Sequence, residues 1–125
     1  MSTDIAVLIA DSDLSTRAEL RQFLDRDSRI GAVAEVSAGD DAVRLAPQAD
    51  VVLVDLRSVN GLGALGVICH IQRHPAHPPV VALARPGDDW LGRAARCEGA
   101  VDVAEWPADG TTLGDRLVQA ARSAG

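Results

Sequence analysis

The sequence of 125 residues contains no lysine and no tyrosine, and only 2% of its residues are aromatic. All 12 basic residues are therefore arginine, which removes two side chains that often act in catalysis. The two cysteines, Cys69 and Cys97, lie in probable helices without CxxC spacing. This favours small buried residues over a disulfide or a metal pair.

The chain also lacks the basic charge that contact with a phosphate backbone requires. Its formal net charge is −6 and its pI is about 4.8, so we expect no direct binding of nucleic acid by this chain. Its longest apolar stretches have the length of strands, and the N-terminus has no signal-peptide pattern. These features predict a soluble, cytoplasmic protein without a membrane partner, folded as one domain over residues 1–125.

What the sequence does contain is a series of short, continuously apolar runs: Ile5 to Ala10, Ala32 to Val36, Val51 to Val54, Val80 to Ala84 and Val101 to Ala104. Continuous rather than alternating hydrophobicity indicates strands that are covered on both faces, as in a parallel sheet. Segments with helical spacing lie between and after the runs: Leu14 to Leu24, Asp40 to Ala46, Leu62 to Arg73, Asp88 to Cys97 and Leu113 to Arg122. The order predicts a (βα)₅ doubly wound α/β sandwich with functional groups at the carboxyl ends of the strands.

Two carboxylates occupy such positions. Asp11 follows the first predicted strand and Asp55 ends the third. These strands are neighbours in a flavodoxin-like sheet of order 2-1-3-4-5, an order adopted from known doubly wound folds, so the two side chains would form one acidic pocket. Adjacent carboxylates repel each other unless a cation, a proton or a ligand joins them.

Three stretches carry a family resemblance: Val7 to Asp13, Asp50 to Gly63, and Gly99 to Pro107. Together they resemble the receiver domains of two-component response regulators, and the resemblance covers essentially the whole chain. The part from Arg29 to Ala46 is most similar to receivers that precede a helix-turn-helix output domain. The resemblance implies a role in signal transduction and transcription regulation, with a histidine kinase or an output domain as partner and a homodimer as a plausible state.

The resemblance also implies roles for site residues. In the family, two consecutive acids and a phosphoacceptor aspartate hold Mg²⁺, while a hydroxyl residue and a lysine contact the phosphoryl group. Asp11 matches the first acid and Asp55 matches the phosphoacceptor. The chain would then need no cofactor and would bind Mg²⁺ weakly at best, through Asp11 and Asp55.

Five positions depart from the family pattern. The second acid is Ser12, the hydroxyl residue is Ala84, the lysine is Trp106, the aromatic switch residue is Val103, and the proline after the phosphoacceptor is Val59. Asp13 lies close in sequence to the missing acid, but its expected role is to cap the following helix. The phosphorylation site is therefore degenerate.

For two residues near this site, Trp106 and Arg85, the sequence allows two interpretations each. Trp106 either covers the former phosphorylation pocket or packs as an ordinary anchor on its rim. The family pattern implies a cis bond between Trp106 and Pro107. Arg85 either lends a cation to the carboxylates or is a solvated loop charge.

Other candidate sites are weaker. His70, His74 and His77 have a spacing that could hold a metal, but nearby prolines interrupt the helix and no acidic or cysteine partner is close. Asp88 and Asp89 are expected to begin a helix. A flavin site is disfavoured because Asp11 and Asp13 place negative charge where a phosphate would bind.

The sequence therefore predicts an atypical receiver domain that is not an enzyme and acts through partner binding or conformational control without conventional phosphotransfer. The alternative is a conditional phosphoacceptor that uses Asp55. A remote alternative is a haloacid-dehalogenase-like phosphatase, suggested by the motif Asp11-Ser12-Asp13. The apolar positions Leu113, Leu117, Val118 and Ala121 form either a dimer face or part of the core.

Overall fold

The computed structural model of the protein describes residues 4–57 and 63–123. Strands and helices alternate as the apolar runs predict, and most bounds agree within two residues. The elements are β1 (Ile5–Ala10), α1 (Leu14–Asp25), β2 (Ile30–Val36), α2 (Gly39–Leu45), the 3₁₀ helix η1 (Ala46–Gln48), β3 (Val51–Asp55), α3 (Ala64–Arg73), β4 (Val80–Ala84), α4 (Asp89–Glu98), β5 (Asp102–Glu105) and α5 (Gly110–Ser123).

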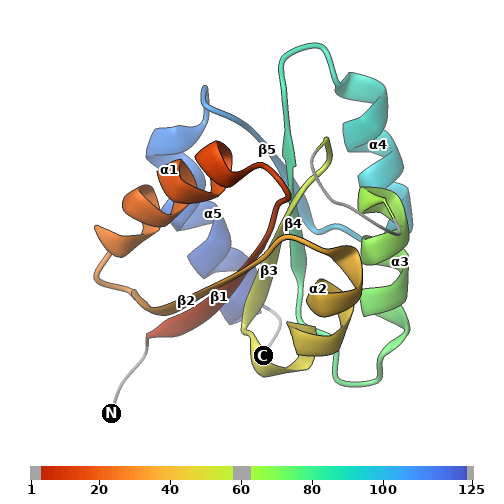
Figure 1. Ribbon diagram of the computed structural model, residues 1–125, viewed down its shortest axis with the longest axis horizontal. Coiled ribbons are helices and arrows are strands. Elements are labelled where there is room, and N and C mark those ends of the chain that lie inside the picture. Colours follow the sequence, from red (N-terminus) through yellow and green to blue (C-terminus); the bar gives the residue numbers. More distant parts are fainter. Residues whose placement is uncertain (1–3, 58–62, 124–125) are drawn as a thin grey trace.

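The five strands form one parallel sheet in the order β2-β1-β3-β4-β5, which confirms the predicted flavodoxin-like sandwich. In Figure 1, α1 and α5 cover one face of the sheet, and α2, α3 and α4 cover the other. Ala10 of β1 pairs with Val54 of β3, and Asp55 pairs with Leu83 of β4. The residues that follow these strands therefore meet at one edge of the sheet.

Two apolar clusters, one on each side of the sheet, make up the core. Strands β3 and β4 are buried along their whole length, as expected for strands covered on both faces. The same expectation was wrong for β2, where Gly31, Ala32 and Ala34 are exposed. This strand lies at the edge of the sheet and pairs only with β1, so the helices cover it incompletely.

The helices begin and end where the sequence provides suitable residues. Asp13 caps α1 by accepting a hydrogen bond from the backbone N–H of Ser15. Helix α4 ends at Gly99, whose positive φ of 119° gives the left-handed conformation common after a helix. In α5, Leu113, Leu117 and Val118 are buried in the core. Packing against the sheet therefore accounts for these three side chains without a dimer face.

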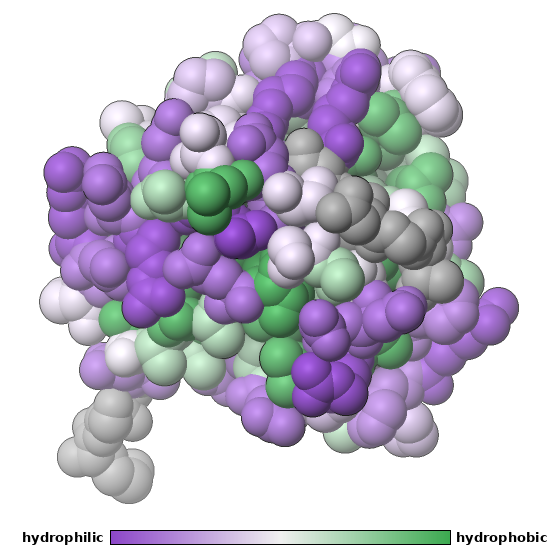
Figure 2. Space-filling model, viewed as in Figure 1, coloured by the Kyte–Doolittle hydropathy of each residue, from purple (hydrophilic) through white to green (hydrophobic). Residues whose placement is uncertain are grey.

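On the face seen in Figure 2, hydrophilic residues predominate and apolar residues occur in separate small groups. Four large apolar side chains are exposed: Leu14 and Phe23 of α1, Trp90 of α4, and Val101 just before β5. Across residues 4–57 and 63–123, no helix has both the length and the apolar character needed to cross a membrane.

Candidate functional site

The acidic pair lies at the carboxyl ends of two neighbouring strands. Asp11 directly follows β1 and Asp55 ends β3, and their exposed fractions are only 0% and 1%. Burying two carboxyl groups together is costly unless their charge is neutralised. The surrounding donors therefore decide what this site can do.

Arg85, on the loop after β4, neutralises Asp55. Its Nη2 atom donates a hydrogen bond to Oδ2 of Asp55 at 2.8 Å, while the backbone N–H of Arg57 donates to Oδ1 at 3.0 Å. Nη2 of Arg85 also lies 3.4 Å from the hydroxyl oxygen of Thr16. Of the two alternatives for Arg85, the structure has the one in which it supplies a cation to the acidic pair. Both carboxylate oxygens of Asp55 are thereby engaged.

Asp11 is neutralised in a different way. The pKa of Asp11 is raised to about 8, first by burial and then by the hydrogen bond and charge of the neighbouring Asp55, against the opposing effects of the Asp13 backbone N–H and the Arg85 charge. Oδ1 of Asp11 accepts a hydrogen bond from the N–H of Asp13 at 2.8 Å. Among the described residues, Oδ2 finds no donor. A proton on Asp11 is therefore favoured near neutral pH.

A second ion pair, between Arg57 and Asp88, lies beside the pair of Arg85 and Asp55. Asp88 accepts hydrogen bonds from Nε of Arg57 at 2.9 Å and from Nη2 of the same guanidinium, and its side chain has no exposed surface. Hydrogen bonding to Arg57 holds the pKa of Asp88 below its usual range. Arg57, which follows β3, thus binds Asp88 in the loop after β4, and Arg85 in that same loop binds Asp55 at the end of β3. The sequence predicted only a helix start at Asp88 and missed this pair.

The turn after β4 holds Arg85 and Asp88, one residue from each of the two ion pairs, close together. Gly87 has a φ of 89°, a conformation that residues with a side chain rarely adopt. The turn brings Oδ2 of Asp88 within 3.2 Å of the backbone N–H of Arg85, while the N–H of Asp88 donates to the carbonyl of Arg85. Asp88 therefore fixes the backbone that carries the site's cation.

The remaining residues of the Asp11-Ser12-Asp13 motif do not enlarge the acidic pair. Asp13 is exposed, and its carboxylate accepts hydrogen bonds from the N–H of Ser15 and the hydroxyl of Thr16. The bond from Thr16 keeps the pKa of Asp13 below its usual range. Ser12 is half-buried and provides a hydroxyl where the family has an acid. The motif gives one buried carboxyl group and one helix cap, and this geometry gives no support to a phosphatase.

The other degenerate positions lie in two places. Ala84 and Val103 line a hollow of about 360 Å³ between α4 and β5, together with Arg85 and Asp88. Trp106, in contrast, belongs to the core cluster on the side of α1 and α5. Position Val59 lies outside the described residues.

The indole of Trp106 is 5% exposed and contacts Phe23 edge to face, with ring centroids 5.2 Å apart. It also lies close to Gly110 at the start of α5. These contacts agree with a packed anchor, and the indole is not part of the wall shared by Ala84 and Val103. The bond between Trp106 and Pro107 is cis, as the family pattern implied.

The donor set does not suit Mg²⁺, which needs several hard oxygen ligands. Both oxygens of Asp55 already accept hydrogen bonds, one of them from a guanidinium, and Asp11 favours its protonated form. Ser12 replaces the remaining acid. Within the described part of the chain, no group of three His, Cys, Asp or Glu side chains could hold a metal ion. His70, His74 and His77 are all exposed.

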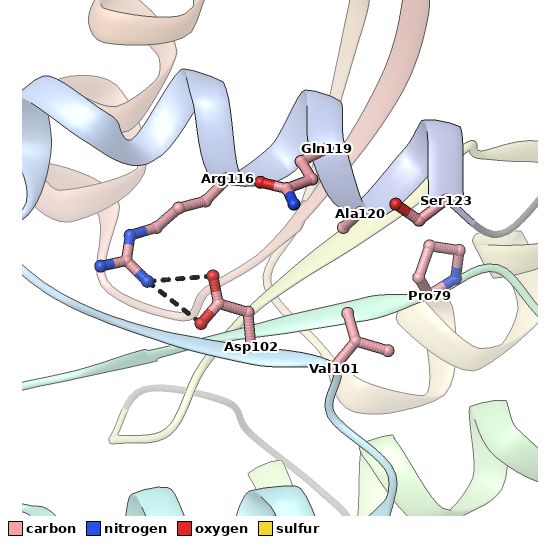
Figure 3. Close-up of a pocket in the computed structure, with 7 residues that line it drawn as sticks. All are labelled: Pro79, Val101, Asp102, Arg116, Gln119, Ala120 and Ser123. Atoms are coloured by element: carbon pink, nitrogen blue, oxygen red, sulfur yellow. Dashed lines mark hydrogen bonds and ion pairs between the residues drawn. The ribbon is translucent and has the colours of Figure 1, made fainter.

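A separate pocket of about 340 Å³ lies between α5 and the start of β5. Figure 3 shows Arg116 of α5 reaching toward Asp102 of β5, and its Nη1 atom is 3.0 Å from both carboxylate oxygens. Arg96 of α4 contacts the same carboxylate at 3.3 Å. All three side chains are partly exposed, so this pocket differs in character from the buried acidic pair.

The sequence was compared with protein families and with known proteins. No protein-family model matches the sequence. The response regulator UvrY of Escherichia coli is 37% identical over 81 residues, which are 63% of this chain and 37% of that protein. The chain is thus similar to little more than a third of the length of these curated relatives.

Two solved structures show the same fold. The signal receiver domain of the response regulator NarL from Mycobacterium tuberculosis matches 95% of this chain and 97% of its own, with a TM-score of 0.85 and 18% identity. The response regulator ChrA of a heme-sensing two-component system matches 96% of this chain and 58% of its own, with a TM-score of 0.82 and 27% identity. The chain has the fold of response-regulator receiver domains, and the resemblance drawn from its motifs is confirmed.

Proposed function

We propose that this chain is a receiver-type signalling module that controls a partner through binding, without conventional phosphotransfer at Asp55. The observation that carries the proposal is the ion pair between Arg85 and Asp55 inside the acidic pair. A phosphoacceptor needs a free carboxylate oxygen as nucleophile and cations to stabilise the transferred charge. Here the carboxylate oxygens are already engaged by donors from its own chain.

The degenerate positions support the same proposal. Ala84 offers no hydroxyl, and Trp106 carries no charge and packs against Phe23. Asp11 favours its neutral form below a pH of about 8, which weakens its attraction for a metal ion. The residues that would stabilise a phosphoryl group on Asp55 are therefore absent from the described positions that correspond to them.

The proposed partner is a signalling protein, either a histidine kinase or an output domain, and a homodimer is compatible with the fold. The proposal places the module in the cytoplasm and assigns it no catalytic turnover. Because the chain matches only part of its curated relatives, control of transcription is proposed for a longer protein of that kind rather than for this domain alone.

The second candidate is a conditional phosphoacceptor, and one observation favours it. Arg85 is 27% exposed and lies on a loop, and partly exposed loop residues belong to the less stable part of a fold. Asp55 would then be a buried carboxylate at the end of β3, with weak Mg²⁺ binding shared with Asp11.

Intact-mass measurement after incubation with acetyl phosphate and millimolar Mg²⁺ separates the two candidates. The proposal predicts no phosphoryl adduct on the wild-type protein and the same mass for Asp55→Asn. Asp88→Asn is a useful third sample because it weakens the contact with Arg57 that helps to fix the loop of Arg85, without changing Asp55. An adduct on the wild type that disappears in Asp55→Asn would contradict the proposal and establish the conditional phosphoacceptor.

A further inference from the structure

We propose that Arg85 is the resident cation of the Asp11–Asp55 site and that its guanidinium keeps divalent metal ions out. The inference rests on the proposed function, since it gives a physical reason why Asp55 does not enter phosphotransfer. It goes beyond that function by naming one residue that determines the cation preference of the site.

The position of the guanidinium carries the inference first. Nη2 of Arg85 is 2.8 Å from Oδ2 of Asp55, whose side chain has no exposed surface. A charge pair in such surroundings interacts far more strongly than one in water. A metal ion that approached this oxygen would have to displace the guanidinium and leave it without its buried partner.

The reach of the charge is the second argument. Thr16 links the guanidinium to the cap of α1, because its hydroxyl lies near Nη2 of Arg85 and donates to Asp13. The positive charge of Arg85 also acts to lower the pKa values of Asp11, Asp13 and Asp88. One arginine thus binds the carboxylate at the end of β3 and also stabilises the charged form of carboxyl groups in the loops after β1 and β4, as a bound metal ion would.

The third argument is that Arg85 is held in place. Its backbone N–H donates to Asp88, and Asp88 in turn binds the guanidinium of Arg57. Nη1 of Arg85 is buried and finds no acceptor among the described residues, so it is directed into protein rather than into solvent. The cation is therefore positioned by the fold, unlike a solvated loop charge.

The test measures Mn²⁺ binding by electron paramagnetic resonance, with Mg²⁺ as competitor, above the pH at which Asp11 ionises. Arg85→Gln should bind Mn²⁺ at least about tenfold more tightly than the wild type, because the carboxylates lose their internal cation. The double variant Arg85→Gln with Asp55→Asn should lose this gain. Arg85→Lys should exclude the metal as the wild type does.

Arg93→Gln is the matched control. Arg93 lines the same hollow as Arg85 but is exposed, and no ion pair joins it to Asp55. Its substitution should leave Mn²⁺ affinity unchanged. A gain equal to that of Arg85→Gln would overturn the inference, because the effect would then come from net charge alone.

Thermal melting with and without Mg²⁺ guards against a variant that folds poorly, since a bound ligand raises the melting temperature of the folded fraction. The expected result is a Mg²⁺-dependent rise in Arg85→Gln and none in the wild type. Equal metal affinity in the two proteins would overturn the inference. If the wild type still acquired no phosphoryl group, the proposed function would survive that result, whereas an Asp55 adduct would refute the function by itself.

Discussion

Two aspartates of this sheet, Asp55 at the end of β3 and Asp102 at the start of β5, each accept hydrogen bonds from arginine in different surroundings. The side chain of Asp55 is fully buried and its partner Arg85 is 27% exposed, whereas Asp102 and Arg116 are 26% and 32% exposed (Figure 3). Water can replace the arginine at Asp102 but not at Asp55. The pairing of aspartate with arginine therefore determines the chemistry of the site at Asp55, whereas at Asp102 it contributes little to stability.

Removal of the buried cation should have the largest effect. Arg85→Met leaves a buried carboxylate uncompensated, and we expect it to lower the free energy of unfolding by about 3 kcal/mol, at the low end for a broken buried pair because Arg85 is partly exposed. Urea denaturation above pH 8 measures the loss. Adding Asp55→Asn should recover part of it. A loss below about 1 kcal/mol would show that the pair is no stronger than a surface contact.

The next effect is a pH dependence of stability. The pKa of Asp11 is raised from 3.8 to about 8, so the folded protein keeps a proton that the unfolded chain releases. The stability linked to Asp11 is complete below pH 4 and is lost as pH rises toward 8.

Asp11→Asn should remove this contribution, because the amide stays neutral and its oxygen can still accept the hydrogen bond from Asp13. The difference in unfolding free energy between variant and wild type should grow from pH 4 to pH 8 in favour of the variant. Parallel pH profiles for the two proteins would mean that Asp11 titrates normally.

A smaller effect is expected where the second ion pair fixes the loop after β4. Asp88→Asn weakens the contact with Arg57 but keeps an oxygen that can accept from the Arg85 backbone. Because Arg57 is 57% exposed and regains water, we expect the urea midpoint to fall by roughly 0.5–1 M. Slower exchange of the loop amides in the variant than in the wild type would contradict this role.

The exposed pair should show the smallest effect. Arg116→Gln leaves Asp102 in contact with Arg96 and solvent, so the predicted loss is about 0.5 kcal/mol and should shrink in high salt. Thermal denaturation at low and high ionic strength measures it. A loss as large as that of Arg85→Met would show that the two ion pairs contribute equally to stability, contrary to the comparison made above.

Much of the fold follows from local sequence patterns. The runs at Val51 to Val54 and Val80 to Ala84 are wholly apolar, and these strands are the two that are buried along their length. The capping role of Asp13 was also predicted, because its side chain only has to reach backbone two residues away. The incomplete cover of β2 was not predicted, since it depends on the position of that strand in the sheet.

The chemistry of the site was less predictable because it depends on contacts between distant loops. Arg57 and Asp88 are 31 residues apart, and no local pattern pairs them. Arg85 follows a degenerate position in sequence, but only the sheet order places its guanidinium on Asp55. For Trp106, the sequence left open whether the indole covers the pocket or packs as an anchor, and the contact with Phe23 places it in the core.

The central claim is that Asp55 is already occupied by an internal cation. The most direct test is a ¹H–¹⁵N correlation spectrum recorded with millimolar Mg²⁺, before and after addition of beryllofluoride as a phosphoryl mimic. We predict that the amide signals of Asp55, Arg57, Arg85 and Asp88 keep their positions in the wild type, as in Asp55→Asn. Saturable shifts of these signals that require Asp55 would show that the carboxylate is free to accept a phosphoryl group and would contradict the account.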